Sequence, residues 1–366
     1  MHIQRLYKLT DVLYPMQRHP FGSLPTGELV QAFTLKNDAG ASLQVITLGG
    51  IVTSLCVPDR HGQVADVVLG FDNLERYLAP HPYIGAIAGR VAGRINRSRF
   101  VLDGRAYELA PNDPPNHLHG GWSGFDRRLW SAIPLSRVDG ADSLRLAYRS
   151  PDGEEGYPGT VNVTVIYTLT ADNAFVIETE ATTDRATPFS LTQHSYFNLA
   201  GEGMGTIEGH ELQIHAEAYA PTDERMALLG RRVPLAGQGN DFNHPRRIGD
   251  ALPHLFQAHG DLYFLSRSGA DKSSEKALRL AARVFEPASG RVLTVSTTED
   301  CLQLYTGVLL DGSLIGKSGQ PYGPHAGLCL ECESYPDGAN TPALGNIILR
   351  PGQLLRHTTV YAFSTH

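Results

Sequence analysis

The chain has 366 residues, with 31 Lys and Arg against 38 Asp and Glu and a formal charge of -7. This length predicts two domains or one large all-β unit, and the mildly acidic balance excludes the basic surface that nucleic acid requires. No stretch reaches the roughly 18 consecutive apolar residues of a membrane span, and residues 1–20 lack the apolar region of a signal peptide, so we expect a cytoplasmic protein without a membrane partner.

Segments that alternate apolar and polar residues, rich in β-branched and aromatic side chains, recur along the chain and predict strands. These segments are 42–47, 143–148, 161–169, 175–179, 293–296 and 358–363. Thirty-eight glycines and 23 prolines punctuate them, and we find no long amphipathic helix pattern and no fixed-period repeat. We therefore predict an all-β fold, a single large β-sandwich domain over residues 26–366, with an N-terminal extension over 1–25 and a surface loop over 267–276.

Two histidines and two arginines stand in the first glycine-rich motifs. Residues 89–96 (GRVAGRIN) carry Arg90 and Arg94, and follow neither the phosphate-loop nor the dinucleotide spacing, so Arg94 is interpreted as a fixed hydrogen-bond donor to a ligand. Residues 116–121 (NHLHGG) carry His117 and His119, followed by glycines that allow close approach of the backbone to a ligand. A His-x-His pair can chelate zinc, but no motif supplying a third ligand is nearby, so we predict no metal site.

A histidine suited to proton transfer lies in the strand-like segment 189–199 (FSLTQHSYFNL). Period-2 alternation would place Thr192, His194 and Tyr196 on one face and Gln193 on the other. With an ordinary pKa of about 6.5, an imidazole can donate a proton and take it back near neutral pH. His194 is therefore a candidate general acid, although a lone histidine is more often structural.

A pair of carboxylates lies in the segment 327–333 (GLCLECE), where alternation puts Cys329, Glu331 and Glu333 on one face and Cys332 on the other. Carboxylates that share a desolvated space repel each other, which raises one pKa toward the range useful for proton exchange. The alternative is that this face meets solvent. Cys329 and Cys332 form a C-x-x-C, but no second pair stands at zinc-finger spacing, and we expect the four cysteines of the chain to be reduced thiols.

Taken in order, these motifs resemble the aldose 1-epimerase (galactose mutarotase) family, whose pattern runs G-R-x-x-N-R-I, L-H-G-G, N-H-x-Y-F-N-L, Q-x-Y-T-G and C-L-E-x-Q-x-x-P-D-x-x-N. The matching segments are GRVAGRI at 89–95, LHGG at 118–121, QHSYFNL at 193–199, QLYTG at 303–307 and CLECESYPDGAN at 329–340. Lesser matches fill the gaps, so the resemblance runs from about residue 21 to the C-terminus. Five spaced motifs in the correct order are hard to obtain by chance.

The resemblance implies a β-supersandwich with a sugar cleft, a free monosaccharide substrate, and interconversion of its anomers by proton transfer without metal or nucleotide cofactor. It implies roles for six residues: Glu331 as general base, His194 as general acid, Arg94 and His119 as donors beside the ring oxygen, and Gln303 and Asp261 as ligands of sugar hydroxyls. The pairing is chemically apt because ring opening needs an acid and a base on different oxygens.

The chain departs from the family pattern at Gly93 and Gln193, which replace asparagines, and at Glu333, which replaces a glutamine. The family's G-x-D-H reads Gly-Asp-Leu at 260–262 here, with no histidine after it. We expect these departures to alter hydroxyl contacts and to shift the preferred substrate away from galactose, toward a pentose or another hexose. We also expect Glu333, on the same strand face as Glu331, to raise the pKa of whichever of the two carboxylates is more desolvated, so that Glu333→Gln moves the acidic limb of the pH profile to lower pH.

Three other functions stay open at this point. A hexose-6-phosphate 1-epimerase would need a basic cluster for the phosphate, for which the candidates are Arg231, Arg232, Arg246 and Arg247. A glycosidase could pair Glu331 with Asp261 or Glu333, which leaves His194 without a role. A non-catalytic sugar-binding module would lack the acid or the base, and this chain has both.

Overall fold

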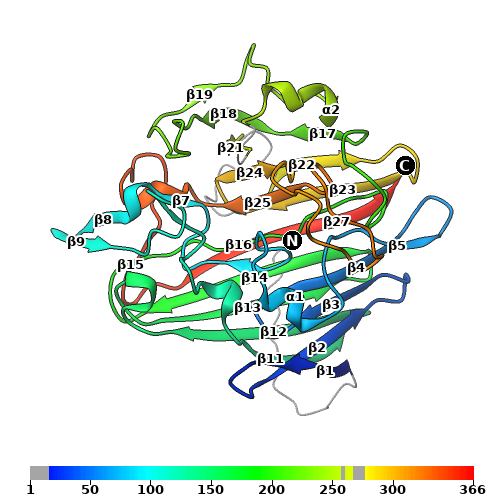
Figure 1. The fold of residues 1–366 in the computed structure, drawn as a ribbon, viewed down its shortest axis with the longest axis horizontal. Coiled ribbons are helices and arrows are strands. Elements are labelled where there is room, and N and C mark those ends of the chain that lie inside the picture. The colour runs from blue at the N-terminus through cyan, green and yellow to red at the C-terminus, as the bar shows by residue number, and fades with distance from the viewer. Residues whose placement is uncertain (1–15, 257–259, 267–276) are drawn as a thin grey trace.

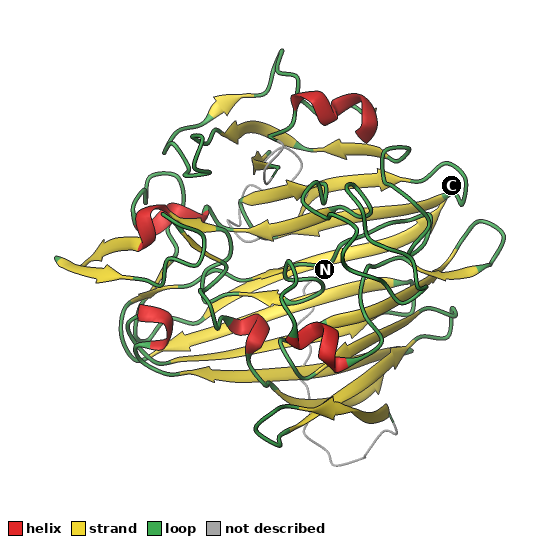
Figure 2. Cartoon of the chain, in the orientation of Figure 1, coloured by secondary structure: helices red, strands yellow, loops and turns green. Residues whose placement is uncertain are grey.

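The fold is described from a computed structural model over residues 16–256, 260–266 and 277–366. The surface loop expected over 267–276 lies outside the described residues. Three antiparallel sheets carry the architecture (Figures 1 and 2).

The first sheet has the strand order β1 (Gln17–Ser23), β2 (Leu29–Lys36), β3 (Ser42–Ile46), β4 (Val52–Pro58), β5 (Val64–Asp66). The second has the order β11 (Ser131–Val138), β12 (Ala141–Ser150), β13 (Val161–Leu169), β14 (Ala174–Thr183), β27 (Leu355–Thr365), β23 (Arg291–Thr297), β22 (Arg279–Phe285), β17 (Glu211–Ile214), β20 (Arg246–Arg247). The third has the order β19 (Val233–Pro234), β18 (Ala216–Ala220), β21 (Asp261–Leu265), β24 (Cys301–Tyr305), β25 (Cys329–Glu333).

Short paired strands connect the sheets: β6 (Ile87–Ala88) with β16 (Thr192–Gln193), β7 (Arg94–Ile95) with β10 (His117–Leu118), β8 (Arg99–Leu102) with β9 (Arg105–Glu108), and β15 (Thr187–Pro188) with β26 (Ile348–Leu349). The helices are short: α1 (Leu74–Leu78), α2 (Ile248–Ala251), and 3₁₀ turns at Asn96–Ser98, Phe125–Arg127, Glu154–Gly156, Leu252–His254 and Pro336–Ala339. Over the described part of the chain, none of the helices has the length and apolar character required to cross a membrane.

One apolar core joins the three sheets. It contains Leu43 and Leu55 from the first sheet, Val165 and Val295 from the second, and Leu302 from the third. Because a single continuous core links residues from β2 to β27, the described chain forms one all-β domain, as the sequence predicted.

The six strands predicted from alternation are confirmed in β3, β12, β13, β14, β23 and β27. Within the N-terminal extension predicted over 1–25, β1 pairs with β2 from Gln17↔Thr34 to Ser23↔Leu29 and so forms the edge strand of the first sheet. Most side chains of β1 are exposed, so this strand lacks the apolar alternation that marks a half-buried one.

Candidate active site

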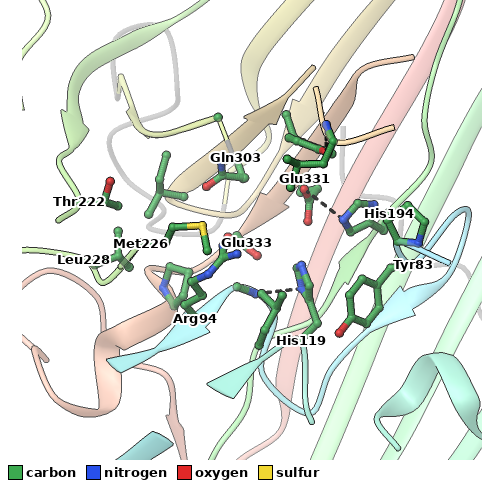
Figure 3. Close-up of a pocket in the computed structure, with 18 of the residues that line it drawn as sticks. Tyr83, Arg94, His119, His194, Thr222, Met226, Leu228, Gln303, Glu331 and Glu333 are labelled. Atoms are coloured by element: carbon green, nitrogen blue, oxygen red, sulfur yellow. Dashed lines mark hydrogen bonds and ion pairs between the residues drawn. The ribbon is translucent and has the colours of Figure 1, made fainter. Parts of the chain in front are cut away.

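A pocket of about 800 Å³, its open mouth included, lies on the face of the third sheet formed by β24 and β25 (Figure 3). Five of the six site residues expected from the sequence line it: Arg94, His119, His194, Gln303 and Glu331. The pocket thus brings together residues that are up to 237 positions apart in the chain, from Arg94 to Glu331.

The strand β25 carries two buried carboxylates into this pocket. Glu331 and Glu333 line it, whereas the alternating residues Leu330 and Cys332 join the core on the other face. The alternation predicted from the sequence is therefore confirmed. The alternative of a solvent-facing strand is wrong, because the exposed fractions of Glu331 and Glu333 are 2% and 1%.

Burial raises the pKa of both carboxyl groups, since the charged form loses its water. The negative charge of Glu331 raises the pKa of Glu333 further, while the Arg94 guanidinium lowers both. The repulsion from Glu331 thus adds to the raised pKa of Glu333, whereas burial is the cause that raises the pKa of Glu331. No described residue bonds Oε2 of either carboxyl group, so these oxygens are available to a ligand or a proton.

His194 faces Glu331 across the pocket. Its position follows from the backbone: His194 N donates to Ala86 O at 2.9 Å, and Gly85 N donates to His194 O at 3.0 Å. His194 Nε2 lies 3.6 Å from Glu331 Oε1 (dashed in Figure 3), and its Nδ1 lies 3.5 Å from Cys329 Sγ. Burial lowers the pKa of His194 to about 4, so the free imidazole is neutral at pH 7.

His119 and Arg94 are brought together by the pairing of β7 with β10, in which Arg94 is opposite Leu118. Gly93 N donates to His119 Nδ1 at 3.1 Å. Burial holds the pKa of His119 well below its ordinary value, so the neutral ring carries its proton on Nε2 and is a hydrogen-bond donor. Arg94 Nε donates to Asp113 Oδ2 at 2.7 Å, an ion pair that fixes the guanidinium.

Gly93 lines the pocket with a backbone φ of +70°. A Cβ atom there would come within 2.4 Å of Pro336 Cγ and 3.1 Å of Glu333 Oε1. Because Gly93 has no side chain, the pocket keeps free space beside the Glu333 carboxyl group.

Gln303 lines the pocket as the cross-strand partner of Glu331, but Asp261, which was expected to bind sugar, does not line it. Gly260 and Leu262 line the pocket, and alternation along β21 turns Asp261 into an adjoining cavity. There Asp261 Oδ2 accepts a hydrogen bond from Phe256 N at 3.4 Å, and burial raises the pKa of Asp261 to about 6.

Gln193, which was expected to alter a sugar contact, does not line the pocket either. Its Nε2 donates to Gly85 O and its Oε1 accepts from Ser195 N, both at 2.8 Å. Gln193 lines a second, smaller cavity behind β25 and braces the backbone on either side of His194.

His117 lies in the core instead of the pocket. Its Nδ1 is 2.7 Å from Ala110 O and its Nε2 is 2.8 Å from Tyr157 Oη, so both ring nitrogens have protein partners and His117 is not available to a ligand. The His-x-His pair therefore does not form a chelate.

A different triad has the geometry of a metal site. His119, His194 and Glu331 each present a ligand atom, and these atoms lie within 4.8 Å of one another. Two neutral imidazoles and a carboxylate can bind a divalent cation, and the same groups can transfer protons. The four cysteines are free, and Cys329 and Cys332 project to opposite faces of β25, where they cannot act as a chelating pair.

The phosphate-binding alternative finds no support in the pocket, because none of its four candidate arginines lines it. Arg232 pairs with Glu217 at 3.1 Å, and Arg246 donates to Gly239 O at 2.6 Å.

Several pocket residues were missed by the sequence analysis: Tyr83, Met226, Leu228, Leu262 and Leu309. The Tyr83 ring lies 4.6 Å from that of His119 and is stacked 5.9 Å from that of His194. No motif or alternation signals these positions.

The fold is an all-β sandwich, and in its pocket a buried histidine faces a buried carboxylate, flanked by amide, imidazole and guanidinium donors. These features define a protein that moves protons on a polyhydroxylated ligand. The family model described as aldose 1-epimerase matches residues 31–362, and the chain therefore belongs to the aldose 1-epimerase family, as an isomerase.

Named relatives agree with this assignment. The galactose mutarotase of Rattus norvegicus is 44% identical over 349 residues, covering 95% of this chain and 98% of that protein. The aldose 1-epimerase of Escherichia coli K12 is 33% identical, covering 93% and 96%. Among solved structures, an aldose epimerase homologue from C. elegans has a TM-score of 0.82 at 27% identity, covering 91% and 98%. The galactose 1-epimerase of Lactobacillus acidophilus has a TM-score of 0.81 at 27% identity, covering 96% and 98%.

Proposed function

We propose that the chain interconverts the α and β anomers of a free aldose with Glu331 as general base and His194 as general acid. Glu331 takes the proton from the anomeric hydroxyl, and His194 gives a proton to the ring oxygen as the bond from C1 to that oxygen breaks. C1 becomes an aldehyde, the C1–C2 bond rotates, and closure on the other carbonyl face returns both protons. Atoms and charge balance without a redox step.

The observation that carries this proposal is the opposition of His194 Nε2 and Glu331 Oε1 at 3.6 Å inside a pocket. The hydroxyl oxygen and ring oxygen of a pyranose are bonded to the same carbon. A base and an acid this close can therefore reach both oxygens at once, which is what concerted ring opening requires.

Arg94, His119 and Gln303 hold the sugar in this proposal. The Nε2–H of neutral His119 and the fixed guanidinium of Arg94 donate to the ring-oxygen side, where negative charge develops as the C1–O bond breaks. Gln303, beside Glu331 in the sheet, binds the hydroxyl next to the anomeric carbon.

The substrate is a free monosaccharide, and the names of the rat and L. acidophilus relatives suggest galactose as a first compound to test. Gly93 and Glu333 keep this site distinct from the family pattern, so we propose a preference shifted from galactose, to a pentose or another hexose. We also propose that the protein acts in the cytosol, where its four free cysteines stay reduced.

Polarimetry of freshly dissolved α-anomer, with and without protein, tests the function. We expect Glu331→Gln and His194→Asn each to lose about 10²-fold or more in rate, while calorimetric sugar affinity stays within about tenfold, because each variant keeps the side-chain shape and loses the proton chemistry.

A matched control is Glu299→Gln, which alters another buried Glu–His pair. Glu299 Oε1 lies 2.9 Å from His357 Nδ1 outside the pocket, so this variant should keep the wild-type rate wherever it folds. A protein that binds sugar without accelerating mutarotation would be a sugar-binding module. Retention of more than about a tenth of the rate in either active-site variant would refute the assigned roles.

A further inference from the structure

A short chain of buried hydrogen bonds starts at the ring nitrogen of His194 that does not face Glu331. This nitrogen, Nδ1, lies 3.5 Å from Cys329 Sγ. The Cys329 thiol and the Tyr196 hydroxyl are hydrogen-bonded to each other, and Tyr196 Oη donates to Pro82 O at 2.9 Å. Cys329 and Tyr196 are fully buried and His194 is 4% exposed, so water does not compete for these bonds.

The carbonyl at the end of this chain sets the direction of every bond in it. A backbone carbonyl has no hydrogen to give, so the Tyr196 hydroxyl must donate to Pro82 O. The Tyr196 oxygen then accepts the hydrogen of the Cys329 thiol, and the sulfur turns its lone pairs toward His194. Because a sulfur in this state accepts a hydrogen bond, the hydrogen between the two residues belongs to Nδ1 of His194.

Strand β25 places a partner at each nitrogen of the ring. Cys329 and Glu331 are two residues apart in this strand, so their side chains leave the same face about 7 Å apart. The His194 ring lies across this interval, with Nδ1 3.5 Å from Cys329 Sγ and Nε2 3.6 Å from Glu331 Oε1. The same strand therefore sets the contacts of both ring nitrogens.

We propose that Cys329 and Tyr196 are positioning residues that keep the hydrogen of neutral His194 on Nδ1, so that Nε2 alone exchanges protons with Glu331 and the sugar. The inference rests on the proposed function for the roles of Glu331 and His194. The shared proton can pass from Glu331 to Nε2 only when Nε2 carries no hydrogen. With the hydrogen on Nε2 the vacant nitrogen would be Nδ1, against the thiol, and Glu331 could not form the imidazolium that ring opening needs.

Nitrogen NMR of protein labelled with ¹⁵N-histidine tests this directly, because ring nitrogens with and without hydrogen resonate far apart. His194→Asn assigns the signals. At pH 6 we expect Nδ1 of wild-type His194 to carry hydrogen. In Tyr196→Phe the thiol loses its acceptor, so the S–H turns to Nδ1 and the ring hydrogen moves to Nε2. The matched control is Tyr361→Phe, which removes another buried hydroxyl, one that donates to Leu330 O at 2.8 Å, and should leave the His194 signals unchanged.

The kinetic test removes the sulfur. A hydrogen bond from a charged donor such as the imidazolium corresponds to about ten- to hundredfold, so we expect Cys329→Ala to lower kcat by that factor while KM stays within about twofold. Cys329→Ser keeps an acceptor for Nδ1 and a hydrogen for Tyr196, and should restore kcat to within about threefold of wild type. Cys332→Ala is the control, because it removes a buried thiol from the opposite face of β25 and should keep the wild-type kcat.

Hydrogen on Nε2 but not on Nδ1 in wild type at pH 6 would overturn the proposal. So would unchanged His194 signals in Tyr196→Phe, or a kcat within about threefold of wild type in Cys329→Ala, where the expected loss is at least tenfold. Should Cys329→Ala fail to fold, Tyr196→Phe decides by the same signals. If wild type shows no mutarotation, the proposed function fails, yet hydrogen on Nδ1 that Tyr196→Phe removes would still establish the hydrogen-bond chain.

Discussion

The pH dependence of kcat/KM tests which groups of the active site hold protons, because burial reverses the ordinary order of the pKa values of the proposed acid and base. Burial lowers the pKa of His194 to about 4 and raises that of Glu331 above its ordinary range. An undisturbed glutamate–histidine pair would hold one proton only between about pH 4.3 and 6.5. The buried pair holds one proton from about pH 4 to above neutrality.

We therefore expect kcat/KM, after subtraction of spontaneous mutarotation, to be flat from about pH 5 to pH 7 and to fall only above neutral pH. The limbs belong to the pair: below the plateau it takes up a second proton, and above it loses the shared one. Each pH unit by which the plateau widens corresponds to about 1.4 kcal/mol of difference in how the surroundings stabilise the protonated and deprotonated forms of a group. A basic limb near pH 6.5 would refute the argument that burial sets these pKa values.

Glu333→Gln sharpens this prediction. Since the repulsion between the carboxylates raises the pKa of Glu333, Glu333 is neutral while Glu331 titrates, and an amide imitates that neutral acid. Both limbs should stay within about half a pH unit of wild type, well under the one-unit change that a lost neighbouring charge gives. A limb that moves by a full unit would show that Glu333 is ionised next to Glu331, contrary to our assignment.

Three further outcomes are expected. Dialysis against EDTA should leave the mutarotation rate unchanged, and loss of rate restored by a divalent cation would assign His119, His194 and Glu331 to a metal site. Glu333→Gln should raise the melting temperature at pH 8 more than at pH 4. A carboxyl group whose pKa is raised in the folded state contributes stability that is complete below its unfolded pKa and is lost as pH rises through the folded pKa. Equal shifts of the melting temperature at both pH values would contradict this. Asp261→Asn should keep kcat/KM within about twofold, because a group outside the pocket makes no substrate contact, and a tenfold loss would restore it to the sugar site.

Local sequence pattern predicted the elements in which one face is apolar. The period of two over GLCLECE was enough to put Glu331 and Glu333 on a common face, since Leu330 and Cys332, which alternate with them, face the core. β13 and β14 were found for the same reason. Pattern alone did not reveal that the carboxylate face is also covered, because that cover comes from segments distant in the chain.

The errors in the predicted site have a common physical origin. All five residues of β21 are buried, so the strand shows no alternation between apolar and polar residues that would fix which side Asp261 faces. Its orientation depends on the pairing of Leu262 with Gln303, a tertiary contact. Gln193 ends a strand of two residues, too short for alternation to continue through His194.

Met226 and Leu228 could not be predicted as pocket residues for a related reason. Met226 and Leu228 lie outside regular strands, and their positions are set by hydrogen bonds from Asn96 to Leu228 and from Asn116 Nδ2 to Arg225 O at 2.8 Å. These asparagines precede the loop by more than 100 residues.

In the proposed mechanism, the shifted pKa values also bear on how Glu331 and His194 would serve both directions of the reaction. In the free protein burial favours the arrangement with the shared proton on Glu331 and a neutral His194, since it raises the first pKa and lowers the second. This is the state that ring opening leaves behind, and the state that ring closure needs, because closure takes a proton from the C5 hydroxyl and gives one to the carbonyl oxygen. Opening needs the other arrangement, with the carboxylate charged and the imidazole protonated.

The two arrangements differ by one proton moved between atoms 3.6 Å apart. Arg94 lowers the pKa of Glu331, and a sugar hydroxyl that donates to the carboxylate would lower it further. A bound cyclic sugar therefore stabilises the arrangement that opens it, and the open aldehyde meets the arrangement that closes it. Because the reaction returns the proton within each turnover, the site needs no exchange with solvent between anomers, and its burial is compatible with rapid catalysis.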